Sequence, residues 1–464
     1  MQLKRAVAPN MVDSRGLASL VEFAIEQGDA YVALALHPFV EKRCQVQLEA
    51  IFFARKRLKL TFAAAPYAPD TALALLIEEH DEQLRRRLSK NPATTPSLLA
   101  KLFVAASPAV IKNLAGHRRI PADILMRIAW RGEETLRTAL CGNVNTPVEL
   151  LRELMVGSSS AEKKGIVTNP NTDEVLLGEL WDKGDKFVRG EVVAHRACPQ
   201  DLRQQALRCP EVLVRRKLAA NDTLTVDSLL LLMKDEDALV RAAAIGNVVL
   251  EDDHLGEVNE DSSIRVRRTE AKRKGLSAQV VAGLAGDDDH WVRRWVARQP
   301  AASDDVLQSL SQDKVMEVRR AVSRNVNCSS DILERLAEDE DSWVRAGVAL
   351  RDDLPRHILM GLESDADIDV KSAVGKNPAT DVAILLAIAA HDNRDVRRSV
   401  IVNPNVPDAA LKKLQDDPYP LNRAILAGHP NCLTENLWFL LKDPEPQVRY
   451  TAGKALAARC LAAL

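Results

Sequence analysis

The sequence predicts an all-α protein in which short helices stack one after another as an α-solenoid. Three observations predict this fold class. A pattern of residues recurs every 26 positions, without insertion or deletion, from residue 65 to residue 455. Polar columns of the pattern mark helix ends, and its apolar columns have helical spacing. The chain is 46% hydrophobic but only 4% aromatic, which favours many small helices over one large aromatic core.

The clearest column, which we call the anchor column, holds Asn or His at 11 of its 16 positions. Pro follows seven of the 16 anchors. Asn and His tolerate left-handed backbone, Asn also makes side-chain turns, and a helix rarely continues up to the residue before Pro. We therefore expect one helix to end at each anchor. The column comprises Ala65, Asn91, His117, Asn143, Asn169, His195, Asn221, Asn247, Arg273, Gln299, Asn325, Arg351, Asn377, Asn403, His429 and Ala455.

A second column predicts where the next helix begins. Four residues after the anchor, 13 of 15 positions hold Pro, Ser, Thr or Asp, which are typical of helix N-termini. Apolar residues follow seven, eight and eleven positions after the anchor, as at Ile332, Leu333 and Leu336, and these share one helical face. A shorter helical element, with apolar residues at seven and about three positions before the anchor, completes the repeat.

Two short helices cannot bury their apolar faces alone, so neighbouring repeats must stack. We expect residues 57–464 to form about 15–16 two-helix repeats. Residues 1–56 lack the pattern and are expected to form an N-terminal helical cap, with 17–25 and 46–53 as candidate helices.

The repeat resembles the leucine-rich repeat variant family, a HEAT-like α-solenoid. The segments DSWVRAGVALRDDLPRHILMGL and NRDVRRSVIVNPNVPDAALKKL carry the resemblance, which covers roughly residues 57–464. Membership implies a right-handed superhelix of alternating α- and short 3₁₀ helices, a bacterial source and no settled activity. A relative in this family carries an N-terminal four-iron–four-sulfur module. The first 60 residues here contain only Cys44, and a cluster needs about four thiolates, so no such module and no cofactor are expected.

A basic column stands six residues before the anchor in 15 of 16 repeats, and from residue 235 on an Asp column stands twelve before it. The planar fork of Arg pairs well with carboxylate, which predicts ion-pair ladders between stacked repeats. In the N-terminal half the Asp column is mostly missing. Residues 1–234 hold 33 Lys and Arg against 27 Asp and Glu, so an anionic partner could bind at that end.

Two further features are candidate binding sites. Around Arg273 the repeat is degenerate and basic, which indicates either a solvated, poorly packed turn or a kink that binds a partner. Trp291 and Trp343 share a column beside the basic one, and Trp with Arg is typical of binding hot spots, although packing at a repeat edge is the alternative. The candidate partner-binding residues are Arg137, Lys163, Arg189, Arg215, Arg267, Arg268, Arg273, Trp291, Arg293, Trp343 and Arg345.

No metal-ligand, nucleophile or phosphate-binding motif occurs, and no apolar run is long enough to span a membrane. The sequence therefore predicts a non-catalytic scaffold that binds a protein partner, without membrane contact. The alternatives are a nucleic-acid binder acting through the basic N-terminal half, and a HEAT-like DNA glycosylase. Seven scattered cysteines favour a reducing cytoplasm, and no start segment resembles a signal peptide. The apolar C-terminal segment KALAARCLAAL is expected either to join a second copy, giving a homodimer, or to fold as a self-contained last helix.

Overall fold

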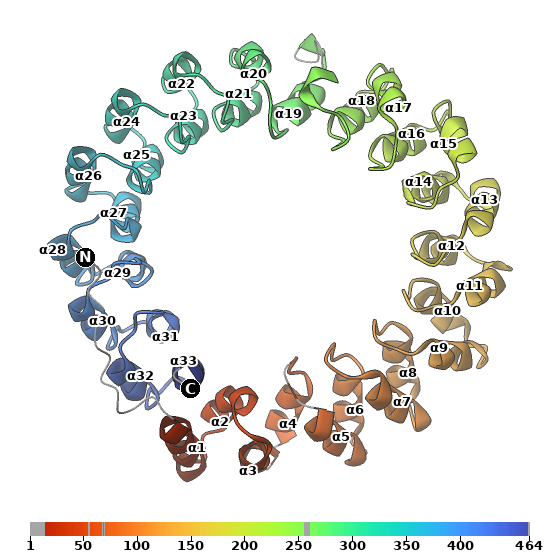
Figure 1. Ribbon diagram of the computed structural model, residues 1–464, viewed down its shortest axis with the longest axis horizontal. Helices are drawn as coiled ribbons and strands as arrows, with labels where there is room; N and C mark the ends of the chain where they lie inside the picture. Colours follow the sequence, from red (N-terminus) through yellow and green to blue (C-terminus); the bar gives the residue numbers. More distant parts are fainter. Residues whose placement is uncertain (1–13, 54–55, 67, 69, 255–259, 463–464) are drawn as a thin grey trace. The chain divides into compact units, whose positions relative to one another are not determined.

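The computed structural model describes residues 14–53, 56–66, 68, 70–254 and 260–462. These residues form 33 α-helices and two 3₁₀ helices and include no strand, which confirms the all-α class. The chain divides into two units. One comprises residues 1–62 with 307–464, and the other comprises residues 63–306. Figure 1 shows that the helices of each unit form two rows, with the two helices of a repeat in different rows.

The helices are short throughout both units. The unit of residues 63–306 contains α5 (Asp70–Glu78), α6 (Glu82–Leu88), α7 (Pro96–Val104), α8 (Pro108–Ala115), α9 (Ala122–Ala129), α10 (Glu134–Cys141), α11 (Val148–Met155), α12 (Ser160–Val167), α13 (Glu174–Lys183), α14 (Lys186–Ala194), α15 (Gln200–Ala206), α16 (Val212–Ala219), α17 (Val226–Leu232), α18 (Ala238–Ile245), η2 (Asp252–His254), α19 (Ile264–Ala271), α20 (Ala278–Leu284) and α21 (His290–Val296). The other unit contains α1 (Ser14–Gln27), α2 (Ala30–Leu36), η1 (His37–Phe39), α3 (Lys42–Phe53), α23 (Met316–Val322), α24 (Ser330–Ala337), α25 (Ser342–Ala349), α26 (Arg356–Glu363), α27 (Ile368–Lys376), α28 (Val382–Ile388), α29 (Arg394–Ile401), α30 (Asp408–Leu414), α31 (Pro420–Gly428), α32 (Thr434–Leu440) and α33 (Pro446–Ala462). The helices α4 (Lys56–Ala63) and α22 (Asp304–Leu310) include the unit boundaries.

The first helix of each repeat begins where the sequence predicts. Its N-cap stands four residues after the anchor, as at Asp173, Thr225 and Ser277, whose side-chain oxygens accept the N–H three residues further on. Such a cap contributes about 1 kcal/mol. Pro147 occupies the same position, because its fixed φ suits a helix start.

The apolar columns form the core between the two rows of helices. Ile332, Leu333 and Leu336 of α24 are at most 3% exposed, as expected for one face packed on the neighbouring repeats. Burial of each such side chain contributes about 1.5–3 kcal/mol. The second element of these repeats is a true α-helix, such as α23, and the 3₁₀ helices within the described residues are η1 and η2.

The Asn anchors form the predicted side-chain turns and, in addition, bind the preceding repeat. Asn169 donates its Nδ2 to the carbonyls of Cys141 (2.9 Å) and Asn143 (2.8 Å) in the preceding repeat, and its Oδ1 accepts the N–H of Asn171. The anchor therefore binds the free carbonyls at the preceding helix C-terminus. Left-handed backbone is not used, since His80 is the one non-glycine residue with positive φ in the described part of the chain. The same paired donation recurs at Asn91, Asn143, Asn247, Asn377 and Asn403.

The degenerate repeat around Arg273 preserves this interface. The guanidinium of Arg273 donates to the carbonyls of Ile245, Asn247 (2.9 Å) and Leu250. Gln299 makes the equivalent bonds to the carbonyls of Ala271 and Arg273. Neither the poorly packed turn nor the kink that the sequence suggested is therefore required, because a longer donor replaces the Asn amide.

At one end of the first unit, the N-terminal helices pack on the last helix. α1 and α2 lie against α33, and Figure 1 shows the three side by side. A Cβ added at Gly453 of α33 would lie 3.5 Å from both Val32 and Ala35 of α2. Arg449 of α33 forms an ion pair with Asp29 at the start of α2 (Nε–Oδ2 2.5 Å). Within the apolar C-terminal segment, Leu456, Ala457 and Cys460 are buried in this chain whereas Leu461 is 42% exposed, and a homodimer through this segment stays a prediction.

Candidate partner-binding surface

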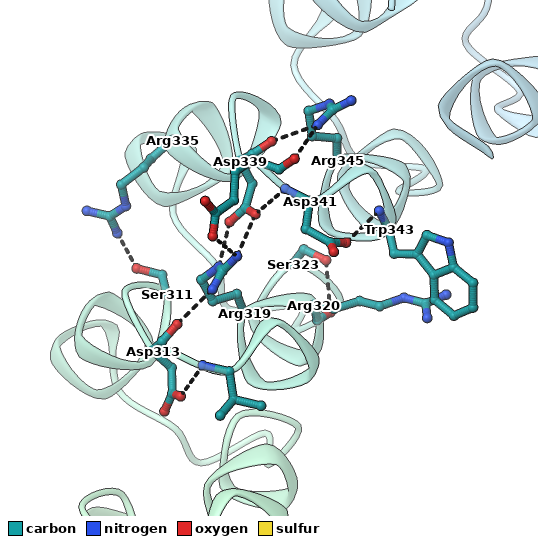
Figure 2. A network of polar contacts seen from close by, with 12 residues as sticks. Ser311, Asp313, Arg319, Arg320, Ser323, Arg335, Asp339, Asp341, Trp343 and Arg345 are labelled. Carbon is teal, nitrogen blue, oxygen red and sulfur yellow. Dashed lines mark hydrogen bonds and ion pairs between the residues drawn. The ribbon is translucent and has the colours of Figure 1, made fainter. Parts of the chain in front are cut away.

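The basic column forms the predicted ladder of ion pairs between repeats. Arg319 of α23 binds Asp339 through two bonds (Nε–Oδ2 2.7 Å, Nη2–Oδ1 2.9 Å) and donates Nη1 to the carbonyl of Asp313 (3.0 Å), as Figure 2 shows. Asp339 also accepts the N–H of Asp341, which begins the next second helix. Pairs between the same two columns are Arg215–Asp235, Arg241–Asp261, Arg267–Asp287, Arg319–Asp339, Arg345–Asp365, Arg397–Asp417 and Arg423–Asp443.

Hydrogen bonds and charge keep the Arg397–Asp417 pair ionised against the opposing effect of burial. Burial alone would raise the pKa of Asp417, but hydrogen bonds from Arg397, the Tyr419 N–H and Asn422 outweigh it and lower the pKa. The bond to Asp417 raises the pKa of Arg397. The carboxylate of Asp417 is fully buried, so the pair is part of the repeat interface rather than of a binding surface. Arg345 and Arg267, both sequence candidates, belong to the same ladder, and Arg293 is likewise buried.

In the basic N-terminal half, the candidates also have partners within the protein. Arg137 pairs with Glu162 (2.9 Å) and donates to the carbonyl of Leu154 (2.8 Å). Burial would raise the pKa of Glu162, but hydrogen bonds from Ser159 and Arg137 lower it. Glu162 is also the third residue of a capping box with Ser159, and that Ser-x-x-Glu motif was the sequence signal that could have identified it.

The remaining three basic candidates behave similarly. The side chain of Lys163 donates to the carbonyl of Lys183 (3.1 Å). Arg189 donates to the carbonyl of Trp181 (3.0 Å) and pairs with Glu211 (3.2 Å). Arg215, with only 8% of its side chain exposed, is already a member of the ladder. The missing Asp column is therefore replaced by acceptors at irregular positions.

Next to Arg267, the sequence candidate Arg268 pairs with Asp289 through two short bonds (2.8 and 2.6 Å). These bonds raise the pKa of Arg268 and lower the pKa of Asp289. About 40% of the Arg268 side chain nevertheless stays exposed, so it is the most accessible of the three basic candidates of this repeat. The guanidinium of Arg273 is occupied by hydrogen bonds to the backbone carbonyls of the preceding repeat.

The two tryptophan candidates are the exposed members of the set. Trp291 and Trp343 are 39% and 49% exposed, and each stacks with an Arg that stands five residues before an anchor. Arg294 lies 4.8 Å from the ring of Trp291, and Arg320 lies 4.6 Å from the ring of Trp343. Figure 2 shows the side chain of Arg320 on α23 reaching across to the ring of Trp343 on α25. Sequence reasoning named Arg268 in this column but missed Arg294 and Arg320; the signal was a partial basic column directly after the main one.

Other chemistry is sparse in the described part of the chain. No group of three or more His, Cys, Asp or Glu side chains there could hold a metal ion. Six of the seven cysteines are buried, and burial raises the pKa of Cys141 to about 12 and that of Cys432 to about 11. Among the described helices, none combines the length and apolar character needed to cross a bilayer.

Comparison with known proteins identifies the repeat. Residues 316–341, from the start of α23 to the start of α25, match the family model described as leucine-rich repeat variant. This one repeat is therefore similar to the repeats of that family. The resemblance that the sequence suggested is thereby confirmed, and the surrounding repeats share its anchor and its Arg–Asp ladder. No curated protein matches the chain.

Solved structures with partial similarity include two helical-repeat proteins. One is described as a leucine-rich repeat variant with a novel repetitive structural motif (24% identity, TM-score 0.35), and the match covers 48% of this chain and 88% of that one. The other is the karyopherin Kap121p bound to the extreme C-terminus of the protein phosphatase Cdc14p (13% identity, TM-score 0.21), with 96% of this chain and 46% of that one covered. The fold assignment here rests on the repeats themselves.

Proposed function

We propose that this chain is a non-catalytic interaction scaffold of the bacterial cytoplasm, which binds a protein partner on the row of second helices. A helical-repeat solenoid suits that role, because stacked repeats present an extended surface. The observation that carries the proposal is how the side chains are used. The regular polar columns are turned inward to bind neighbouring repeats, whereas Trp291 and Trp343 remain exposed beside stacked Arg side chains.

Exposed Trp with Arg favours protein recognition, since these residues dominate the binding energy of protein interfaces. Nucleic-acid binding through the basic N-terminal half has less support, because Arg137, Lys163, Arg189 and Arg215 already donate to acceptors within the protein. A homodimer through the C-terminal helix would have to use the face of α33 that α1 and α2 leave exposed, which includes Leu461.

The test is affinity capture from native lysate with the purified chain as bait, with and without nuclease. We expect one stoichiometric protein that survives nuclease and is lost when Trp291→Ala or Trp343→Ala, tested separately, replaces the wild type. Trp130→Ala is the matched control, because Trp130 is 76% exposed but lies at the end of the first helix α9. Capture that disappears with nuclease would instead support the nucleic-acid alternative.

A further inference from the structure

A shallow groove crosses three consecutive second helices, α23, α25 and α27. Its volume is about 180 Å³, and its lining includes Arg320, Trp343, Leu350, Asp369 and Lys376. Because these residues come from three successive repeats, the groove runs along the stack rather than along any one helix.

Contacts within the groove fix the positions of Trp343 and Arg320, but the positive charges of Arg320 and Lys376 have no ion-pair partner in the described part of the chain. The indole Nε1 of Trp343 donates to Oδ2 of Asp369 (2.9 Å), which fixes the ring, and Arg320 stacks on that ring at 4.6 Å. Stacking leaves the N–H edges of the guanidinium directed away from the ring. Within the described residues, neither Arg320 nor Lys376 forms an ion pair, and the buried Nε of Arg320 has no hydrogen-bond partner.

The groove therefore offers two cations that form no ion pair with any described residue, one carboxylate that keeps its charge while it accepts the Trp343 N–H, and an apolar wall. Leu350 and Trp343 are 39% and 49% exposed and supply that wall. The volume is below the roughly 300–1,000 Å³ of sites that enclose a small molecule or cofactor. A site of about 180 Å³ suits one or two side chains of a longer ligand that continues along the surface.

The geometry points to a docking site for an extended segment of a protein partner in which an acidic side chain neighbours an apolar one. The carboxylate of that segment binds Arg320 and Lys376, and its apolar neighbour packs on Trp343 and Leu350. The inference rests on the proposed scaffold function and names the chemistry of its partner.

A peptide suits the groove better than a nucleic acid. A bound nucleic-acid strand needs a run of phosphate contacts, but only two cations here lack partners, and the carboxylate of Asp369 would repel the next phosphate. On the next repeats, Arg398 is held by Asp395 (2.9 Å) and Asn422 (3.0 Å), so the row of uncompensated cations does not continue there.

The experiment is selection of a random peptide display library on the full-length chain, followed by affinity measurement of the enriched peptides. We expect enriched peptides to place Asp or Glu beside an apolar residue. We expect their affinity to fall at least tenfold in the double variant Arg320→Gln and Lys376→Gln, and also in Trp343→Ala. The matched control is Lys412→Gln with Lys413→Gln, which removes two exposed charges from the first helix α30 and should leave affinity unchanged.

The outcomes separate this inference from the scaffold proposal. Protein capture that persists in the groove variants, with selected peptides insensitive to them, overturns the groove but leaves the scaffold standing. Failure to capture any protein overturns the scaffold itself. A single-stranded 30-mer oligonucleotide that competes for the groove, and loses affinity in the Arg320 and Lys376 variant, overturns the choice of a peptide. Near-ultraviolet and far-ultraviolet circular dichroism of each variant establishes that the fold is intact.

Discussion

The ion pair between Asp29 and Arg449 gives the sharpest test of how the first unit is held together. The Arg side chains of the ladder pair with an Asp of the following repeat, as Arg319 does with Asp339, whereas Arg449 pairs with Asp29, close to the opposite end of the chain. Asp29 also caps α2, because its Oδ1 accepts the N–H groups of Tyr31 (2.9 Å) and Val32 (3.2 Å). One carboxylate therefore starts α2 and attaches it to α33.

Two substitutions separate these roles. Asp29→Asn keeps an N-cap of similar quality but removes the charge, and a hydrogen bond to a charged partner contributes about 1.5–3 kcal/mol. Asp29→Ala also removes the cap, which adds about 1 kcal/mol. The side chains of Arg449 and Asp29 are only 20% and 14% exposed, so solvent weakens the pair little.

Because each solenoid repeat packs only against its neighbours, removing the Asp29–Arg449 ion pair should destabilise α2 and α33 and leave distant helices unaffected. In hydrogen exchange monitored by mass spectrometry, we expect amides of α2 and α33 to exchange roughly 10- to 150-fold faster in Asp29→Asn, since each 1.4 kcal/mol is tenfold. Asp222→Asn is the control, because Asp222 and Arg196 form an exposed pair, with 49% and 83% of their side chains accessible. Unchanged protection of α33 in Asp29→Asn would refute the coupling of these two helices through Asp29.

Four further outcomes follow from the same interfaces. Asn169→Ala leaves two buried carbonyls without donors and should lower the free energy of unfolding by about 2–3 kcal/mol in urea titration; a loss under about 0.5 kcal/mol would contradict the role of the anchor. Gly165→Ala would place a Cβ 2.8 Å from that of Cys141, so we expect a lower melting temperature, whereas a rise would show that α10 and α12 can separate freely. The folded pKa of Asp417 is below the usual 3.8, as are the pKa values of the ladder residues Asp365 and Asp443, so the unfolded chain binds more protons as pH falls. Stability should therefore be full above about pH 4 and decline below it, and urea midpoints that do not fall between pH 5 and pH 3 would argue against the ladder. In native labelling with iodoacetamide, only Cys44 should react readily, because the other cysteines are buried. Mass spectrometry that finds Cys141 modified before Cys44 would contradict the burial of Cys141.

The sequence was sufficient for features that each repeat determines locally. Ser329 stands at the N-cap position, and Ile332 and Leu333 face the core, because capping and helical periodicity act within one or two turns of helix. The pairing of Arg319 with Asp339 was also predictable, since a constant spacing between the Arg and Asp columns brings the same two positions together in each repeat.

Features that break the period could not be predicted in the same way. Glu162 replaces the missing Asp beside Arg137 from a different position of the repeat, so no column revealed it. The contact of α1 and α2 with α33 joins segments from opposite ends of the sequence that share no repeat pattern. The right-handed superhelix and the division into a cap of 1–56 and a solenoid of 57–464 stay predictions.

The distinction between periodic and aperiodic positions also orders the functional candidates. A residue type that recurs in every repeat serves what every repeat needs, which is attachment to its neighbour, and Arg319 and Asn169 are used in that way. Recognition of one partner needs chemistry that differs from repeat to repeat. Trp343 and Arg320 meet that condition, because the equivalent positions elsewhere hold residues as different as Leu421 and Ala424. The strongest repeat signal therefore marks the interior of the solenoid, and we expect departures from it on exposed second helices to determine binding specificity.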